Sequence, residues 1–273
     1  MTMRNREPMT ILRTEGFLEV GDGERIWFET AGTGPDIVLC HGLGGNGAVW
    51  YQQVPYFARN YRVITWDQRG FGRSSNAAQK HGPLSAASDL LALLDHLAVS
   101  RAHVIGQSMG GWAALGAAIS APARIASLVL ACTTGGIPVD RGAPTRRSQL
   151  VTGAATPLGE HPAIGERLRQ LDPARAYLYQ ALGTFGDRPS DAEFMRVLAG
   201  TTFDGDKVRK LDIPALVIAG ELDGLMTPTL LREAATWLSR GSVVEMPGLG
   251  HSPYFEDPDA WNSVLENFLA RQQ

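Results

Sequence analysis

A serine between glycines is the residue of this chain best suited to chemistry. The stretch 106–110 reads GQSMG, and it follows an apolar run and precedes an alanine-rich segment. A sharp strand-to-helix turn strains its central residue and leaves no room for neighbouring side chains, which favours glycine on both sides. Such a turn exposes the Ser108 hydroxyl at a helix N-terminus, where the Met109 backbone N–H can hold an oxyanion. The alternative is a serine that only caps a helix after a tight turn.

A serine hydroxyl needs a general base, and the base needs an orienting acid. Of the six histidines, His251 is the best base, because it follows the last strand-like run in PGLGHSPYFEDP. The alternative for His251 is a loop histidine packed under the C-terminal helix. The acid should follow an earlier strand, and ALVIAG at 215–220 leads to Asp223, with Glu221 as its competitor. We expect Ser108, His251 and Asp223 to form the catalytic group.

Alternating strand-like and helical segments must position these residues. A hairpin is expected around the turn Gly21-Asp22-Gly23. Nearly continuous apolar runs, typical of parallel strands buried on both faces, follow at 36–40, 61–66, 102–106, 127–132, 215–220 and 242–246. Helical spacing or composition marks 48–59, 84–98, 110–120, 228–239 and 258–270. The pattern predicts an α/β fold with about eight strands, mostly parallel, and helices on both faces.

One region interrupts this alternation. Between Gly135 and Lys207 there is no buried-strand pattern; the region opens with TTGGIPVDRGAPT and continues with amphipathic pieces at 164–171 and 175–182. Some 70 residues between two core strands indicate a lid over a site. We therefore expect a helical cap at 135–206, inserted in a core formed by 1–134 and 207–273.

Five stretches of the chain resemble the α/β-hydrolase fold superfamily. They are CHGLGG (40–45), WDQRGFGRSS (66–75), GQSMGG (106–111), GELDGLMTP (220–228) and GLGHSPYFEDP (248–258). The chain order serine, aspartate, histidine is also that of the superfamily. The resemblance runs from end to end and implies an α/β-hydrolase fold, with the Leu43 N–H as second oxyanion donor beside that of Met109. By the same resemblance, 66–75 is a structured turn near the site.

The nucleophile position holds serine, not aspartate, which argues against the haloalkane dehalogenases and epoxide hydrolases that share the fold. We expect acyl transfer on a small-molecule ester or lactone, as in the similar 3-oxoadipate enol-lactonases and small carboxylesterases. The alternatives are C–C bond hydrolysis of a vinylogous diketone, of the meta-cleavage product type, cofactor-free perhydrolysis, and a ligand receptor with a slow triad. Trp50, Trp112, Tyr254 and Phe255 are candidates for lining the substrate pocket, with core packing as the alternative for each.

A second glycine pattern points to a different chemistry. GLGGNG at 42–47 fits the dinucleotide-binding pattern GxGxxG, and Asp67 ends the next strand-like run. The hairpin before this unit argues against a nucleotide-binding half, and the serine-centred group explains the loop without a cofactor. There is no HExxH pattern and no cluster of His and Cys. We expect no cofactor and no metal.

Composition limits the partners. The chain has 273 residues, a net charge of −3 and no dense basic run, which argues against nucleic-acid binding. No apolar run approaches the roughly 18 residues of a membrane span, and the first residues lack a secretory signal pattern. Cys40 and Cys132 lie in apolar runs and are expected as buried free thiols. We expect a cytoplasmic protein without membrane partners, either monomeric or homodimeric.

Overall fold

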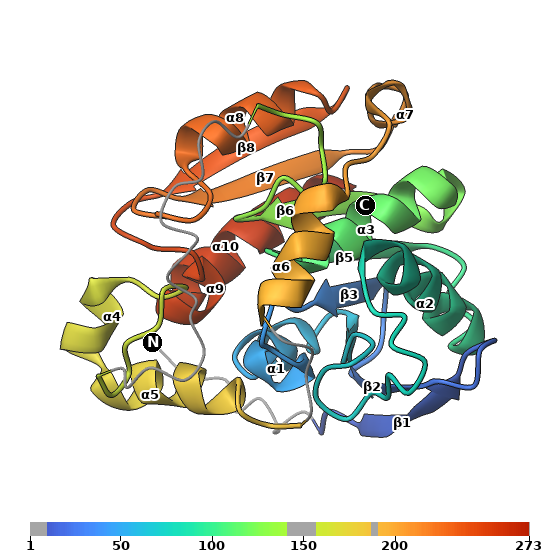
Figure 1. Ribbon diagram of the computed structural model, residues 1–273, viewed down its shortest axis with the longest axis horizontal. Helices are drawn as coiled ribbons and strands as arrows, with labels where there is room; N and C mark the ends of the chain where they lie inside the picture. The colour runs from blue at the N-terminus through green and yellow to red at the C-terminus, as the bar shows by residue number, and fades with distance from the viewer. Residues whose placement is uncertain (1–9, 141–156, 187–190, 273) are drawn as a thin grey trace, which may run out of the picture.

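An eight-stranded, mostly parallel sheet organises the chain, as the sequence predicts (Figure 1). The computed structural model describes residues 10–140, 157–186 and 191–272. The strand order is β1-β2-β4-β3-β5-β6-β7-β8; β1, β2 and β4 pair antiparallel, and every pair from β4 to β8 is parallel. The strands are β1 (Arg13–Glu19), β2 (Arg25–Ala31), β3 (Asp36–Cys40), β4 (Arg62–Trp66), β5 (Ala102–Gln107), β6 (Ile125–Ala131), β7 (Ala215–Gly220) and β8 (Gly241–Met246).

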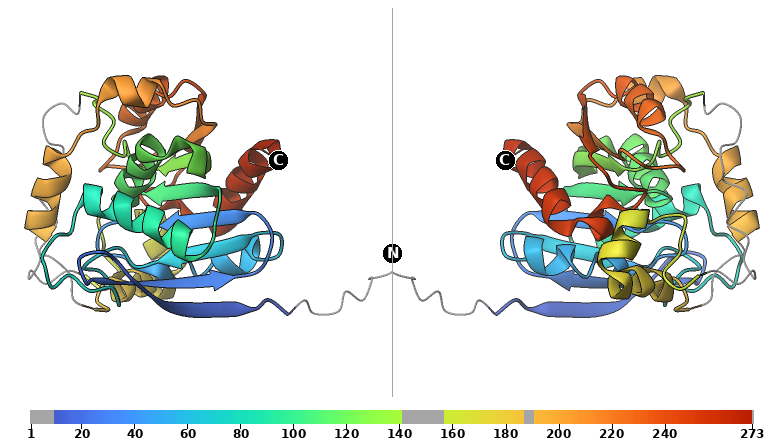
Figure 2. Two further views of the ribbon diagram at one scale, coloured as in Figure 1. Left: turned by 90° about the vertical axis from the view of Figure 1, so that its right-hand side faces the viewer. Right: turned by 90° about the vertical axis from the view of Figure 1, so that its left-hand side faces the viewer.

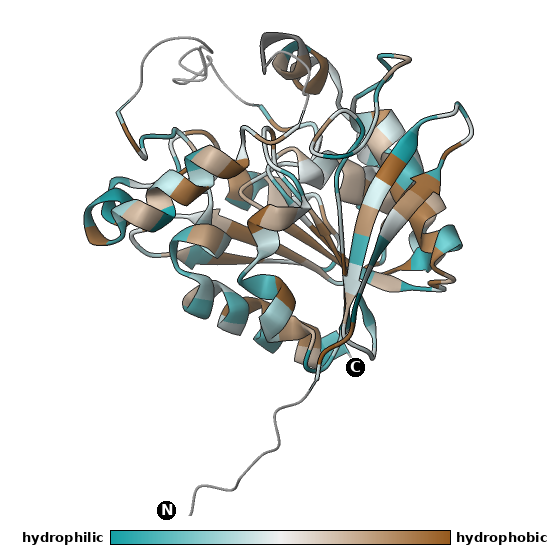
Figure 3. Ribbon diagram, turned by 90° about the horizontal axis from the view of Figure 1, so that it is seen from below, coloured by the Kyte–Doolittle hydropathy of each residue, from teal (hydrophilic) through white to brown (hydrophobic). Residues whose placement is uncertain are grey.

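Two layers of helices cover the sheet, one on each face (Figure 2). Helices α2 (Pro83–His96), α3 (Gly110–Ser120) and α8 (Pro228–Thr236) pack on one face, with Val38 of β3 pointing to them. Helices α1 (Gln53–Phe57) and α10 (Pro258–Leu269) pack on the other, with Ile37 and Leu39. Because successive strand residues face opposite sides, an uninterrupted apolar run fills both cores. Figure 3 shows these apolar strands enclosed between the helices.

The helix expected at 48–59 is two short elements. A 3₁₀ helix, η1 (Gly47–Trp50), precedes α1, which begins only at Gln53. Pro55 lies in the first turn of α1, where its missing N–H costs no intrahelical bond. A continuous helix from 48 would place that proline in its interior and break it. The prediction of one helix was therefore wrong at this point.

Residues 135–206, which lie between β6 and β7, are called the inserted segment below. Its helices are α4 (Glu166–Leu171), α5 (Pro173–Leu182) and α6 (Asp191–Gly200), and α7 (Gly205–Arg209) leads back into the core. Helix α4 packs on α5, and α5 contacts η1. Helix α6 lies apart from this pair (Figure 1), and its Phe194 and Leu198 join the core that contains α2 and α3. Residues 141–156 and 187–190, which belong to the expected cap, lie outside the described residues.

Three further elements complete the chain: η2 (Pro122–Arg124), α9 (Pro253–Glu256) and η4 (Ala270–Gln272). Cys40 and Cys132 are both buried and unpaired, as expected. In the part of the chain that is described, no helix combines the length and the hydropathy needed to span a bilayer.

Candidate active site

The turn between β5 and α3 presents Ser108 in a strained conformation. Its φ is 49°, in the left-handed region that residues with a side chain rarely adopt. A Cβ on Gly106 would lie 2.5 Å from the Gly110 carbonyl oxygen, and one on Gly110 would overlap the backbone of Cys40. The Ser108 N–H donates to the Ala131 carbonyl at 2.9 Å, which fixes the turn to β6. The flanking glycines are therefore required by close backbone packing.

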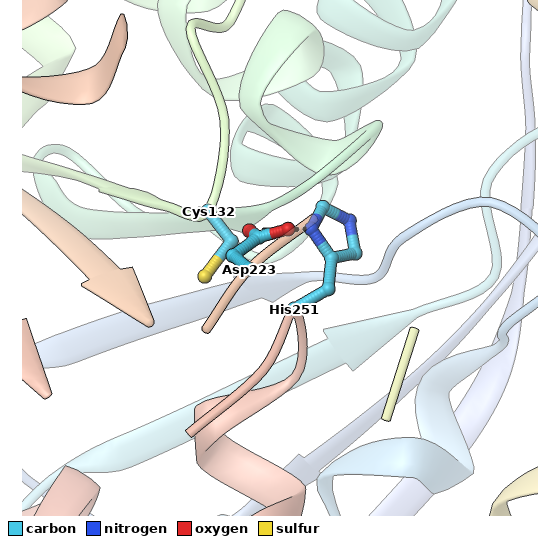
Figure 4. Close-up of side chains that lie close together, drawn as sticks. All are labelled: Cys132, Asp223 and His251. Carbon is cyan, nitrogen blue, oxygen red and sulfur yellow. Dashed lines mark hydrogen bonds and ion pairs between the residues drawn. The ribbon is translucent and has the colours of Figure 1, made fainter. Parts of the chain in front are cut away.

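Ser108, His251 and Asp223 form one hydrogen-bonded chain. His251 Nε2 lies 2.8 Å from Ser108 Oγ, and His251 Nδ1 lies 2.8 Å from Asp223 Oδ2. His251 and Asp223 are 5% and 3% exposed, so water competes little for these bonds. Figure 4 shows the Asp223 carboxylate directed at the imidazole. Because a carboxylate only accepts, Nδ1 carries the proton and Nε2 is free to accept the serine proton.

The loop after β7 holds Asp223 in place. Its Oδ1 accepts the backbone N–H groups of Leu225 at 2.8 Å and Met226 at 2.9 Å, so Oδ2 is left for His251. The competing acid, Glu221, is exposed and accepts the N–H of Gly248 at 2.8 Å. Glu221 therefore holds the backbone of the histidine loop at Gly248. The structure places Asp223, and not Glu221, at His251.

Cys132 lies beside this group (Figure 4). In residues 10–140, 157–186 and 191–272, Cys132, Asp223 and His251 are the only three donors close enough to hold a metal ion, with their atoms within 4.8 Å of one another. Burial, reinforced by the nearby Asp223 carboxylate, raises the pKa of the Cys132 thiol well above its usual range, so the thiolate that a metal requires is disfavoured. Both Asp223 oxygens are also already engaged. The Asp223 carboxylate therefore orients the imidazole, and the three side chains do not fit a cation.

The residues of the two predicted oxyanion donors line one cavity with Ser108. Leu43 and Met109 line a cavity of about 90 Å³ together with Ser108 and His251. Neither backbone N–H donates to an acceptor among the described residues. A backbone N–H without a protein acceptor can donate to an oxygen of a bound ligand, and both residues line the cavity that Ser108 also lines.

The remaining wall of the cavity is mostly apolar. The core contributes Gln107, Trp112, Leu225 and Met226, and the inserted segment contributes His161, Ala163, Tyr179, Met195 and Leu198. Of the predicted pocket residues, Trp112 is thus placed on the cavity. Trp50 and Tyr254 pack on each other, with ring centroids 4.4 Å apart, and both contact Trp261 in the core, away from this lining. Phe255 is buried in the same core.

The glycine-rich stretch 42–47 is part of a structural turn. The buried Asp67 carboxylate accepts the N–H groups of Gly47 at 2.6 Å and Arg73 at 2.8 Å. His41 accepts the Gln68 N–H at 2.9 Å, and burial lowers the His41 pKa, which keeps the ring neutral. The Asp67 carboxylate therefore holds the loops at 42–47 and 66–75 together. This structural role explains why an aspartate follows the glycine pattern at the end of the next strand.

Three side chains near His251 were not singled out from the sequence. Gln107 donates from Nε2 to the His251 carbonyl at 3.0 Å, Tyr179 shares a 2.9 Å hydrogen bond with Ser252, and Glu256 accepts backbone N–H groups on both sides of His251. Gln107 and Glu256 stand inside the quoted motifs GQSMGG and GLGHSPYFEDP, so their position near the site was visible. The contacts of Gln107 and Tyr179 were not, because each joins segments far apart along the chain.

Comparison with known proteins places the chain in a family. The family model described as the Alpha/beta hydrolase family matches residues 37–264, and the chain belongs to this family. It is 31% identical over 265 residues to a putative non-heme bromoperoxidase of Mycobacterium tuberculosis, covering 89% of this chain and 97% of that protein. Among solved structures it resembles a thermophilic esterase from Thermogutta terrifontis, with a TM-score of 0.81, 25% identity, and 96% and 99% of the two chains covered. It also resembles an enol-lactonase from Burkholderia xenovorans, with a TM-score of 0.79, 25% identity, and 93% and 100% covered. The chain is thus a hydrolase with the α/β-hydrolase fold.

Proposed function

We propose that this hydrolase cleaves a carboxylic ester or lactone of a small molecule through an acyl-enzyme on Ser108. The observation that carries the proposal is the 2.8 Å contact of His251 Nε2 with Ser108 Oγ, on a strained turn that faces a cavity. The esterase and enol-lactonase named above have the same fold and support this bond class. The mostly apolar lining of the cavity favours an apolar acyl or alcohol group.

The geometry supports a two-step mechanism. His251 Nε2 takes the Ser108 proton as Oγ attacks the carbonyl carbon, and Asp223 stabilises the imidazolium that forms. The N–H groups of Leu43 and Met109 stabilise the oxyanion; losing one such donor typically costs about 3–4 kcal/mol. Collapse breaks the ester C–O bond, and His251 gives the proton to the leaving oxygen. Water, deprotonated by His251, then attacks the acyl-enzyme and releases the acid; a lactone is released as one hydroxy acid.

A small substrate panel tests the proposal. Wild-type protein and Ser108→Ala are assayed on p-nitrophenyl acetate, p-nitrophenyl butyrate, several lactones and a vinylogous diketone. Ala tolerates the positive φ as poorly as Ser does, so the variant keeps the local strain while removing the hydroxyl. Ser263→Ala, an exposed serine on α10, is the matched control.

Each outcome of the panel has a defined meaning. Ester or lactone hydrolysis that Ser108→Ala abolishes and Ser263→Ala retains supports the proposal. Cleavage of the diketone alone assigns the site to C–C bond hydrolysis. Stoichiometric ligand binding with negligible turnover of every substrate assigns it to a receptor. Ester turnover that persists in Ser108→Ala rules out Ser108 as the nucleophile.

A further inference from the structure

The Glu256 carboxylate is buried against the loop that carries His251. Glu256 ends α9 and is 7% exposed. Its Oε2 accepts the Gly250 N–H at 3.0 Å, and its Oε1 accepts the Ser252 N–H at 3.3 Å. These amides belong to the residues immediately before and after His251. One carboxylate therefore fixes the backbone on both sides of the imidazole.

The backbone of the inserted segment also packs against this carboxylate. Gly165, the residue before α4, packs against Glu256, and its backbone N–H lowers the pKa of that carboxyl. A Cβ on Gly165 would lie 2.7 Å from Oε2, and a Cβ on Gly250 would lie 2.9 Å from both Oε1 and the Gly165 nitrogen. The two glycines thus allow two distant backbone segments to meet at one carboxylate.

Tyr179 makes a second link between the inserted segment and the histidine loop. Its hydroxyl lies 2.9 Å from Ser252 Oγ, and its ring packs edge-on against Phe255 with centroids 4.8 Å apart. Burial raises the pKa of Tyr179 to about 12, so its hydroxyl stays protonated at neutral pH. Since Tyr179 also lines the cavity, the inserted segment contacts the substrate space and the histidine loop at once.

Keeping the buried Glu256 carboxylate ionised costs free energy of folding. Burial raises the pKa of Glu256, although the three amides act in the opposite direction, and the Asp223 charge adds to the rise. No guanidinium or ammonium group of the described residues forms an ion pair with the Glu256 carboxylate; Arg175 donates to the Glu256 backbone carbonyl at 3.4 Å, and Arg167 lines the adjoining groove. Burying a carboxylate without a cationic partner costs free energy, and groups with perturbed pKa values cluster at functional sites.

We propose that Glu256 is a positioning residue that holds His251 at Ser108 and ties that placement to the docking of the inserted segment. Withdrawal of Gly165 from the carboxylate would loosen the histidine loop, so the packing of Gly165 beside this loop and the competence of the base are linked. The inference rests on the proposed function, because it assigns a role through His251.

Two variants test the link from its two ends. Glu256→Gln keeps the side-chain shape but turns an amino group toward an N–H donor, so the N–H of either Gly250 or Ser252 loses its acceptor. Gly165→Ala leaves the histidine loop unchanged in sequence but pushes a methyl group into the same carboxylate. We expect each to lower kcat for p-nitrophenyl butyrate by about 10–100-fold with KM changed less than about threefold, because small displacements of a catalytic group have effects of this size. Glu266→Gln, on the outer face of α10, is the matched control and should keep the wild-type kcat.

The kcat and KM values decide the outcome, with circular dichroism used to show that each variant is folded. A folded Glu256→Gln with unchanged kcat, or with a change in KM alone, overturns the proposal. A loss in Glu256→Gln without one in Gly165→Ala overturns the link to the inserted segment. If Glu256→Gln does not fold, the kcat of Gly165→Ala decides alone. Ser108→Ala is assayed in parallel. If Ser108→Ala retains the wild-type activity, the proposed function is wrong. If activity requires Ser108 but Glu256→Gln has the wild-type kcat, only the role inferred for Glu256 is wrong.

Discussion

Gln107, the residue before Ser108, donates a 3.0 Å hydrogen bond from Nε2 to the backbone carbonyl of His251. Gln107 is 1% exposed, and its Oε1 lies so close to Gly42 that a Cβ there would overlap it. The side chain thus joins three loops: the first glycine-rich turn, the turn at Ser108 and the histidine loop. The distance between Ser108 and His251 is therefore set partly by a side chain that does no chemistry.

Replacing Gln107 with Met, which has similar volume and no amide, should loosen this junction. The His251 carbonyl loses a buried donor, which costs about 1–3 kcal/mol of the free energy of unfolding. We also expect a lower kcat with little change in KM. Urea unfolding and ester kinetics measure the two effects. A variant with wild-type stability and wild-type kcat would show that water replaces the amide at no cost.

The orienting acid should be distinguishable from its neighbour by kinetics. Asp223→Asn keeps the shape but presents an amide that cannot hold the productive tautomer of His251, and comparable changes lower kcat by about 10⁴-fold. Glu221→Gln removes a carboxylate two residues away that contacts Gly248 and not His251, so kcat should change by less than about threefold. Ester hydrolysis by the two purified variants measures this. Equal losses in both would refute the assignment of Asp223 as the acid.

The turn at Ser108 should tolerate no side chain at Gly110. A Cβ at Gly110 would overlap the Cys40 carbonyl, which belongs to buried backbone and cannot move aside. Overpacking of this kind costs about 1–3 kcal/mol or more. Gly21→Ala is the control, because no atom lies within 4 Å of its new Cβ. Thermal unfolding should show a clear loss for Gly110→Ala and almost none for Gly21→Ala; equal unfolding temperatures would mean that the turn is looser than the structure shows.

The sequence was sufficient for features that depend on local pattern. Apolar runs defined the parallel strands, and GQSMG located the turn at Ser108, because the steric demand of that turn lies within five residues. Contacts between distant segments were not accessible in this way. Glu256 meets Gly165 only because α4 docks beside the histidine loop. Likewise, the sequence alone does not distinguish Trp50 from Trp112. The packing of their elements places Trp50 in the core and Trp112 at the cavity.

Acid should destabilise the fold through His41, which sits behind the first glycine-rich turn. His41 Nδ1 donates to the Gly42 carbonyl at 2.8 Å, and Nε2 accepts the Gln68 N–H at 2.9 Å, so both nitrogens are used by the neutral ring. Burial lowers the His41 pKa, against a smaller opposing effect of Asp67. The unfolded chain therefore binds a proton at His41 near pH 6.5, whereas the folded chain binds it only at a lower pH. The free energy of unfolding should fall as pH drops below about 6.5, and this loss should continue down to the lower pKa of the folded state.

Urea unfolding between pH 8 and pH 5 measures this dependence in wild type and in His41→Asn. The slope due to one histidine is at most about 1.4 kcal/mol per pH unit. His41→Asn should be less stable at pH 8, because the Gln68 N–H loses its acceptor, and its stability should fall less steeply with acid. Some slope should remain, since burial also lowers the pKa of His103. Parallel curves for the two proteins would show that His41 does not titrate on unfolding in this range, and would place the acid sensitivity in other groups.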